Sequence, residues 1–85
     1  MSTKLNITYS AYREMEQIPQ SPLRSIGEAI INLADEPYPP GSAPLKGNGG
    51  CYYIAIDDYY ILYQIADDDI LTILGVLYGS YHPLH

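Results

Sequence analysis

The sequence is poor in cysteine and lacks two of the three aromatic residue types. Cys51 is the only cysteine among 85 residues. An internal disulfide framework is therefore excluded, and a reducing compartment fits. Phe and Trp are absent, and all ten aromatic residues are tyrosines. Because a tyrosine ring packs well while its hydroxyl stays in water, this composition favours half-buried positions, either on a solvated sheet face or at an interface.

Basic residues are also scarce, with four Lys and Arg against ten Asp and Glu and a net charge of −6. The four are Lys4, Arg13, Arg24 and Lys46, and none follows position 46. Proteins that bind nucleic acids without sequence preference use Lys and Arg to neutralise phosphates and release counterions. The composition therefore argues against free DNA or RNA binding and against binding to an anionic membrane surface.

Long hydrophobic runs are missing as well. The longest apolar segment, 70–77, is interrupted by Thr72 and Gly75. It has the length of a strand, whereas roughly 20 apolar residues are needed to span a bilayer. The polar segment 1–9 lacks the apolar stretch of a signal peptide. These observations predict a cytoplasmic protein without a membrane segment.

No residue pattern calls for a metal or a cofactor. The acidic run 67–69 lacks the alternating ligands and the closing Glu of an EF-hand loop. The glycines of segment 47–50 follow Lys46, whereas a phosphate-binding loop places its glycines before the lysine. We therefore predict neither a metal site nor a cofactor.

The first third of the chain predicts a strand followed by two helices. Segment 5–9 alternates apolar and polar residues, as a short strand does. Ser10 is placed to cap a helix over 11–18, and Ser21 followed by Pro22 is typical of a second helix start. The second helix has an apolar stripe at helical spacing. This stripe consists of Leu23, Ile26, Ile30 and Leu33.

The rest of the chain predicts a three-stranded meander. Pro37 ends the second helix, and Pro and Gly residues mark a connection over 37–50 with little regular structure. Strands are expected over 52–56, 59–66 and 70–78, with acidic turns at 57–58 and 67–69. Their connections are too short for parallel crossovers. We predict a single α+β domain, 1–85, with two N-terminal helices packed on one face of a small, mostly antiparallel four-stranded sheet.

Five sequence words between residues 29 and 79 carry a family resemblance. They are Ala29-Ile30-Ile31-Asn32-Leu33, Pro37-Tyr38-Pro39-Pro40-Gly41, Leu45-Lys46-Gly47, Tyr52 with Ile54, and Asp58-Tyr59 with Ile61-Leu62-Tyr63. In this order they resemble the RelE/ParE toxin superfamily of bacterial type II toxin–antitoxin systems. The resemblance implies a RelE/ParE-like fold and an antitoxin as partner. For members that cleave mRNA on the ribosome, it also implies nuclease activity.

The chain departs from the family pattern where the family carries arginine. Tyr53 and Ala55 stand at the two arginine positions of the first meander strand. Tyr60 replaces the arginine of the next strand, and Leu77 stands where arginine is common in the last. The resemblance implies that in nuclease members such residues bind the RNA backbone and stabilise the charged transition state. This stabilisation is a large contribution to catalysis. Their replacement predicts lost or altered nuclease activity.

Four residues are candidates for catalysis by family position: Lys46, Tyr81, His82 and His85. Lys46 lies in a matched word, but a solubilising loop lysine would fit the same place. The three residues near the C-terminus are acid–base candidates, and the two histidines also have a spacing that suits a metal. A packing tyrosine followed by a frayed tail is the alternative.

Tyr53, Tyr60 and Tyr78 form the predicted binding surface. A row of tyrosines would bind a peptide, a helix or a second protomer better than a phosphate. We therefore favour a toxin-like protein that acts through protein binding, to an antitoxin-like protein or by self-association; a gyrase-like target is a sub-case. The alternative is an active ribosome-dependent mRNA endonuclease, whose partners would be the ribosome and mRNA.

Overall fold

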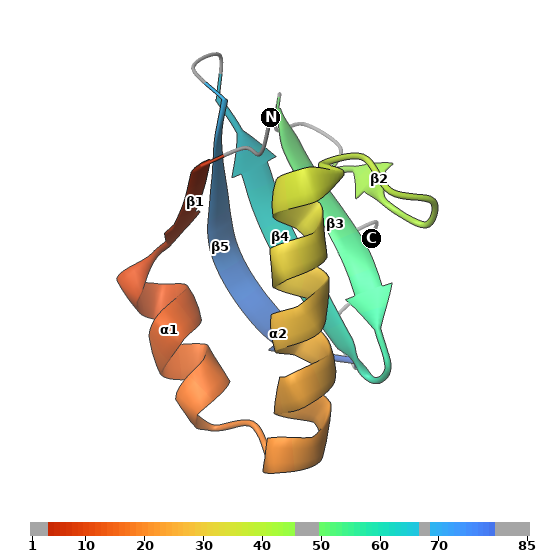
Figure 1. Ribbon diagram of the computed structural model, residues 1–85. Helices are drawn as coiled ribbons and strands as arrows, with labels where there is room; N and C mark the ends of the chain where they lie inside the picture. Colours follow the sequence, from red (N-terminus) through yellow and green to blue (C-terminus); the bar gives the residue numbers. More distant parts are fainter. Residues whose placement is uncertain (1–3, 46–49, 67–68, 80–85) are drawn as a thin grey trace.

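The computed structural model describes residues 4–45, 50–66 and 69–79, which form two helices and five strands (Figure 1). The elements in chain order are β1 (Lys4–Ile7), α1 (Tyr9–Glu16), α2 (Gln20–Asp35), β2 (Ala43–Pro44), β3 (Cys51–Ile56), β4 (Tyr59–Ile65) and β5 (Ile70–Tyr78). Both helices lie on the same face of the sheet, as predicted (Figure 1). The predicted α+β class is therefore confirmed.

The sheet has five strands, so the predicted number of four is wrong. Its order is β1-β5-β4-β3-β2, with β1 parallel to β5 and all other pairs antiparallel. The additional strand, β2, lies inside the proline-rich connection and has only two residues, Ala43 and Pro44. Proline lacks a backbone N–H, and it is tolerated at this position because β2 is an edge strand. The antiparallel meander of β3, β4 and β5 is confirmed.

Both helices begin earlier than predicted. The cap of α1 is Thr8, whose Oγ1 accepts a hydrogen bond from the Ala11 N–H at 3.1 Å, and Ser10 lies inside the first turn. The cap position of α2 is Pro19, which makes no side-chain cap bond, so the predicted Ser21 cap is also wrong. The end of α2 at Asp35 agrees with the prediction from Pro37.

The core lies between the helices and the sheet. Three residues of the predicted stripe on α2 are buried: Ile26, Ile30 and Leu33. They pack against the side chains that β4 and β5 direct to the helix face: Ile61, Tyr63, Leu71, Ile73 and Val76. Burial of each such side chain contributes roughly 1.5–3 kcal/mol, so this cluster accounts for much of the stabilisation of the fold.

The tight turn between β3 and β4 is the predicted two-residue acidic turn. Asp57 has a φ of 53°, a left-handed conformation that Asp tolerates better than most residues. Gly79, directly after β5, lies so close to the Asp58 carbonyl that a side chain there would clash with the backbone. Of the second acidic turn, 67–69, only Asp69 lies within the described residues. Among those residues, no helix is long and apolar enough to cross a membrane.

Candidate functional site

The three long strands have two chemically different faces. Side chains alternate between the faces along each strand, and paired residues on neighbouring strands share a face. Residues that pair with the core positions Ile61 and Tyr63 therefore lie under the helices. The opposite face, here called the open face, is not covered by a described helix (Figure 1). Its members on β3, β4 and β5 include Cys51, Tyr53, Ala55, Tyr60, Leu62, Gln64 and Leu77.

The four positions at which the family resemblance expects arginine lie together on the open face. Ala55 pairs with Tyr60, and Tyr60 pairs with Leu77, so these three form one row across the sheet. The ring of Tyr53 lies 6.0 Å from that of Tyr60, edge to face at 65°. β3, β4 and β5 contain no charged residue in their described lengths. These three strands thus offer no cation to bind a phosphate there, and Lys4 on β1 pairs with Ile70, at the other end of β5 from Leu77.

Tyr78 does not belong to this surface, so the predicted row of three tyrosines is wrong in that respect. Tyr78 pairs with Tyr59 at the end of β5, on the helix side of the sheet. Its ring is 5.4 Å from the Tyr59 ring, nearly perpendicular at 83°, and the residue is 62% exposed. The alternation within 70–78 alone did not reveal this, because a β-bulge near Leu74 shifts the register between β4 and β5.

The four catalytic candidates, Lys46, Tyr81, His82 and His85, lie outside the described residues. Within the described ranges no three His, Cys, Asp or Glu side chains gather as a metal site would require. Cys51 is a free, half-buried thiol at the start of β3. The described part of the chain therefore brings together an aromatic surface, with no set of acid–base groups on it.

A second tyrosine cluster fixes the proline-rich connection against the helix face. The Tyr52 ring stacks on the buried Tyr63 ring at 5.9 Å, and Tyr38 meets Tyr52 edge to face at 5.1 Å. The Tyr63 hydroxyl donates a hydrogen bond to the Pro37 carbonyl at 2.9 Å. Burial raises the pKa of Tyr63 above its ordinary value, and a hydrogen bond with Ser42 opposes part of that shift. This cluster has a structural role. Because Tyr38 packs on the helix face, it does not cover the open face.

α1 is attached to the sheet by two polar side chains at the bulge of β5. β1 pairs with β5 only as far as Ile73, so the next backbone groups of β5 have no strand on that side. The Thr8 hydroxyl donates to the Leu74 carbonyl at 3.3 Å, and the Val76 N–H donates to Glu14 Oε1 at 2.9 Å. These side chains satisfy backbone groups of β5 that would otherwise be unpaired beyond the end of β1.

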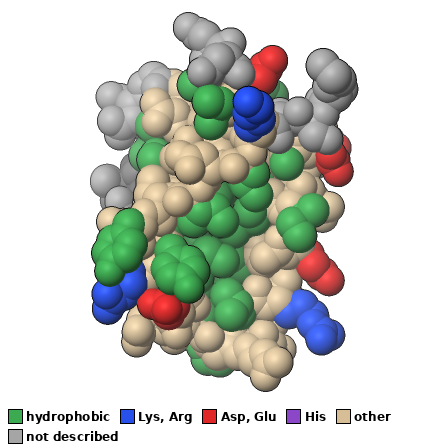
Figure 2. All heavy atoms as spheres, turned by 60° about the vertical axis from the view of Figure 1, so that its left-hand side comes forward, with side chains coloured by type: hydrophobic (Ala, Val, Ile, Leu, Met, Phe, Trp, Pro, Cys, Tyr) green, Lys and Arg blue, Asp and Glu red, His purple; other side chains and the backbone are tan. Residues whose placement is uncertain are grey.

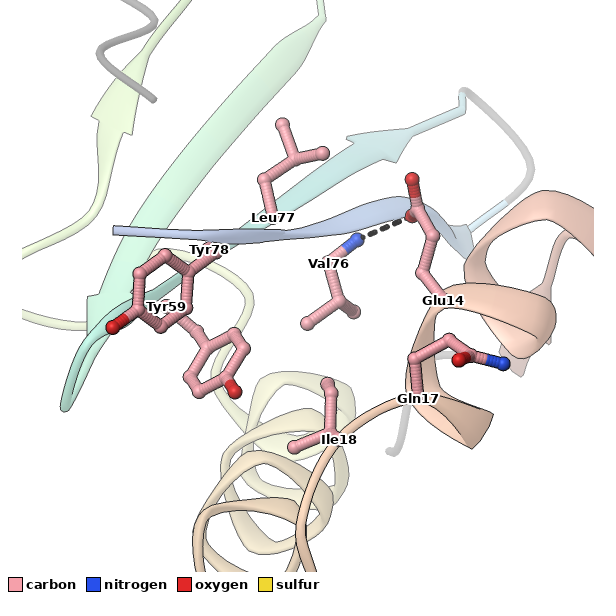
Figure 3. Close-up of a pocket in the computed structure, with 7 residues that line it drawn as sticks. All are labelled: Glu14, Gln17, Ile18, Tyr59, Val76, Leu77 and Tyr78. Carbon is pink, nitrogen blue, oxygen red and sulfur yellow. Dashed lines mark hydrogen bonds between the residues drawn. The ribbon is translucent and has the colours of Figure 1, made fainter. Parts of the chain in front are cut away.

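A pocket that the sequence did not predict lies between the end of α1 and the ends of β4 and β5 (Figure 3). It has a volume of about 330 Å³. Glu14 and Gln17 lie at one end, Tyr59 and Tyr78 at the other, and apolar side chains lie between them (Figure 3). No sequence signal could have found it, because its residues meet only through the bulge, the strand register and the docking of α1.

Nearly the whole chain fits one known family. The sequence pattern of the family described as the ParE toxin of type II toxin-antitoxin system, parDE, matches residues 7–82. The chain belongs to the ParE toxin family. No curated protein matches the sequence of this ParE-family chain.

Solved structures related to this ParE-family chain share its fold. The toxin–antitoxin complex RelBE2 from Mycobacterium tuberculosis is 25% identical, with a TM-score of 0.81 over 92% of this chain and 99% of that chain. The RelE–RelB complex from Pyrococcus horikoshii OT3 is 22% identical, with a TM-score of 0.82 over 96% and 100%. The YoeB/ParE toxin from Agrobacterium tumefaciens is 22% identical, with a TM-score of 0.76 over 88% and 96%. The predicted membership of the RelE/ParE superfamily is confirmed.

Proposed function

We propose that this ParE-family chain acts by binding a protein partner and does not cleave RNA. The observation that carries the proposal is the chemistry of the open face. The row of Ala55, Tyr60 and Leu77, with Tyr53 beside it, takes the positions at which the resemblance expects arginine. Without cations there, the negative charge that develops in phosphoryl transfer would have little stabilisation from the sheet. Tyrosine and leucine side chains suit a protein interface instead.

The partner that fits best is an antitoxin-like protein. The relatives from Mycobacterium tuberculosis and Pyrococcus horikoshii were solved as complexes with RelB-type proteins, which supports this choice. The edge strand β1 pairs only with β5, so its outer backbone groups are available for a further strand within the described part of the sheet. Self-association would use the same kind of surface.

A single domain, 1–85, and a cytoplasmic location remain predictions.

The β1 and α1 side of the molecule adds support for a protein partner. Figure 2 views the molecule from this side and shows hydrophobic side chains gathered at the centre of the face, with charged groups near its margins. The exposed large apolar residues include Leu5 and Ile7 on β1 and Tyr9 and Tyr12 on α1. Contiguous exposed apolar surface commonly marks an interaction site.

Two measurements on the full chain test the proposal. The first is primer extension on mRNA in a translating ribosome system, with an active ribosome-dependent nuclease as positive control. We expect no cleavage, and codon-spaced cleavage by this chain would overturn the proposal. The second is the affinity for an antitoxin-like protein of the RelB type, measured by calorimetry.

Substitutions on the open face make the second measurement specific. We expect the double variant Tyr53→Ala/Tyr60→Ala to bind the antitoxin-like protein at least about tenfold more weakly, because aromatic anchors carry much interface energy. Ile31→Ala removes an exposed apolar side chain from α2, outside both surfaces described above, and is the control for the open face. Circular dichroism verifies that each variant is folded. Equal affinity of the folded double variant and the wild type would contradict the use of this face.

A further inference from the structure

We infer that the pocket between α1 and the ends of β4 and β5 receives an arginine side chain of a protein partner. Most residues that line the pocket lie on the helix side of the sheet, and Leu77 of the open face also contributes to it (Figure 3). The inference goes beyond the proposed function and does not depend on which surface an antitoxin-like protein covers.

The charge of the pocket favours a cation. Glu14 is the one charged residue among those that line it, and no described Lys or Arg does so. Arg13, the neighbour of Glu14 in sequence, is held elsewhere: its guanidinium donates to the Tyr9 hydroxyl at 3.0 Å and pairs with Glu16 at 3.3 Å. Asp57 and Asp58 are exposed and form the turn directly before Tyr59, the first residue of β4 and a residue of the pocket wall. Carboxylates from a helix and from a turn thus create a negative potential around the pocket.

The pocket walls favour a planar cation. The rings of Tyr59 and Tyr78 are nearly perpendicular, so they do not stack face to face, and Tyr78, which is 62% exposed, has ring surface that is open to a ligand. A guanidinium stacks on such a ring and is attracted by its negative face within about 6 Å of the centroid. The methylene stem of arginine can then pack on the apolar floor, where Ile18 and Val76 lie between the two ends of the pocket (Figure 3).

Glu14 can serve a ligand without giving up its structural bond. Oε1 of its carboxylate accepts the hydrogen bond from the Val76 N–H. A carboxylate has a second oxygen, which can accept an N–H of a guanidinium, and the Gln17 side-chain carbonyl offers another acceptor at the same end of the pocket. Arginine is the side chain whose several N–H donors and planar group match this combination of acceptors and rings.

The test uses N-acetyl-arginine methylamide, with N-acetyl-citrulline methylamide as the neutral probe of the same shape. Each is titrated into the ¹⁵N-labelled full chain and followed by ¹H–¹⁵N correlation spectra. We expect the arginine probe to shift the amides of 76–78 and of 17–18, and to bind at least about fivefold more tightly than the citrulline probe. Equal affinity of the two probes, or shifts spread evenly over the acidic surface, would overturn the inference.

Two variants locate the interaction. Glu14→Gln removes the charge but keeps an oxygen that can accept from the Val76 N–H, so α1 should stay attached. We expect it to weaken binding of the arginine probe about fivefold, as Tyr78→Leu should. Glu28→Gln on α2 and Tyr12→Leu on α1 alter an exposed carboxylate and an exposed tyrosine outside this pocket, and should leave the affinity unchanged. If Glu14→Gln binds as the wild type does, the pocket is not the site. Because no antitoxin-like protein is present, failure here leaves the proposed function standing.

Discussion

At the residue scale, the chain uses its tyrosines for three different purposes. Tyr63 is fully buried and holds the proline-rich connection through its hydroxyl. Tyr53 and Tyr60 meet on the open face, and Tyr59 and Tyr78 meet in the pocket on the other side of the sheet. The amphipathic side chain of tyrosine allows all three, since its ring packs on apolar neighbours while its hydroxyl can contact water or a polar group.

Replacement of Tyr63 by phenylalanine should separate its hydroxyl bond from its packing. Tyr63→Phe keeps the ring and leaves the Pro37 carbonyl without this donor, so we expect a loss of about 1 kcal/mol in the free energy of unfolding at pH 7.5. Urea denaturation followed by circular dichroism measures it. Tyr12→Phe, at an exposed position, should change the free energy by less than about 0.5 kcal/mol.

The difference between wild type and Tyr63→Phe should also depend on pH. Burial raises the pKa of the Tyr63 phenol in the folded protein, whereas in the unfolded chain it ionises at about pH 10. As the pH rises through 10, the unfolded wild type therefore loses this proton first, and its unfolding becomes more favourable. The variant lacks the phenol, so the difference in unfolding free energy should narrow above about pH 10. A difference that stays constant up to pH 11 would contradict the burial of this hydroxyl.

At the scale of elements, α1 depends on one residue for both its start and its attachment. Thr8 caps α1 through the Ala11 N–H, and its hydroxyl donates to the Leu74 carbonyl on β5. Glu14 provides the other attachment, two turns further along the helix. The helix is only eight residues long, too short to be stable in isolation, so these contacts with the sheet determine whether it forms.

Substitution at the two candidate cap residues should distinguish the observed cap from the predicted one. Thr8→Ala removes the cap bond and the partner of the Leu74 carbonyl, so we expect a loss of about 1–2 kcal/mol in stability. Ser10→Ala lies within the first turn of α1 and should change stability by less than about 0.5 kcal/mol, because alanine is a good helix former. Thermal and urea unfolding of both variants measure this. Similar losses in the two variants would contradict the assignment of Thr8 as the cap.

The errors in the predicted elements arise where contacts with distant parts of the chain decide the local structure. Ser10 is the better cap residue by type, but Thr8 caps α1 because its hydroxyl also bonds to the Leu74 carbonyl on β5. β2 was missed because two residues with a proline carry no strand pattern, and the strand exists only through pairing with Tyr52 and Tyr53. Elements set by their own periodicity were predicted well: α2 to its last residue, and the three meander strands to within one residue at each end.

At the scale of the whole molecule, the net charge of −6 has a spatial arrangement. β3, β4 and β5 carry no charged residue, and the charge within the described sheet is Lys4 on β1. The described acidic residues lie on the helices, in turns and in connections. Two of the turn residues, Asp57 and Asp58, directly precede the pocket residue Tyr59 in the chain. We expect this excess of acidic charge to disfavour the approach of nucleic acid at low ionic strength.

This arrangement predicts that the purified protein has no measurable affinity for nucleic acid. We expect no change in the fluorescence anisotropy of a labelled single-stranded RNA of 20 nucleotides, at either 50 mM or 200 mM salt, because few cations are available to release counterions. A basic member of the same fold family serves as the positive control. Binding that weakens steeply between the two salt concentrations would show phosphate contacts and contradict this expectation.

The sequence by itself determined the class of fold, the meander and the loss of cations. These conclusions follow from local or compositional properties of the chain. The properties are the alternation of the strands, the helical spacing, Pro37 and the count of Lys and Arg. Only the tertiary structure decided that Ala55, Tyr60 and Leu77 form one row, that Tyr78 lies on the opposite face, and that Glu14 shares a pocket with two tyrosines. These relations depend on strand register and on a single extra residue at a bulge, and a shift of one position transfers a side chain to the other face of the sheet.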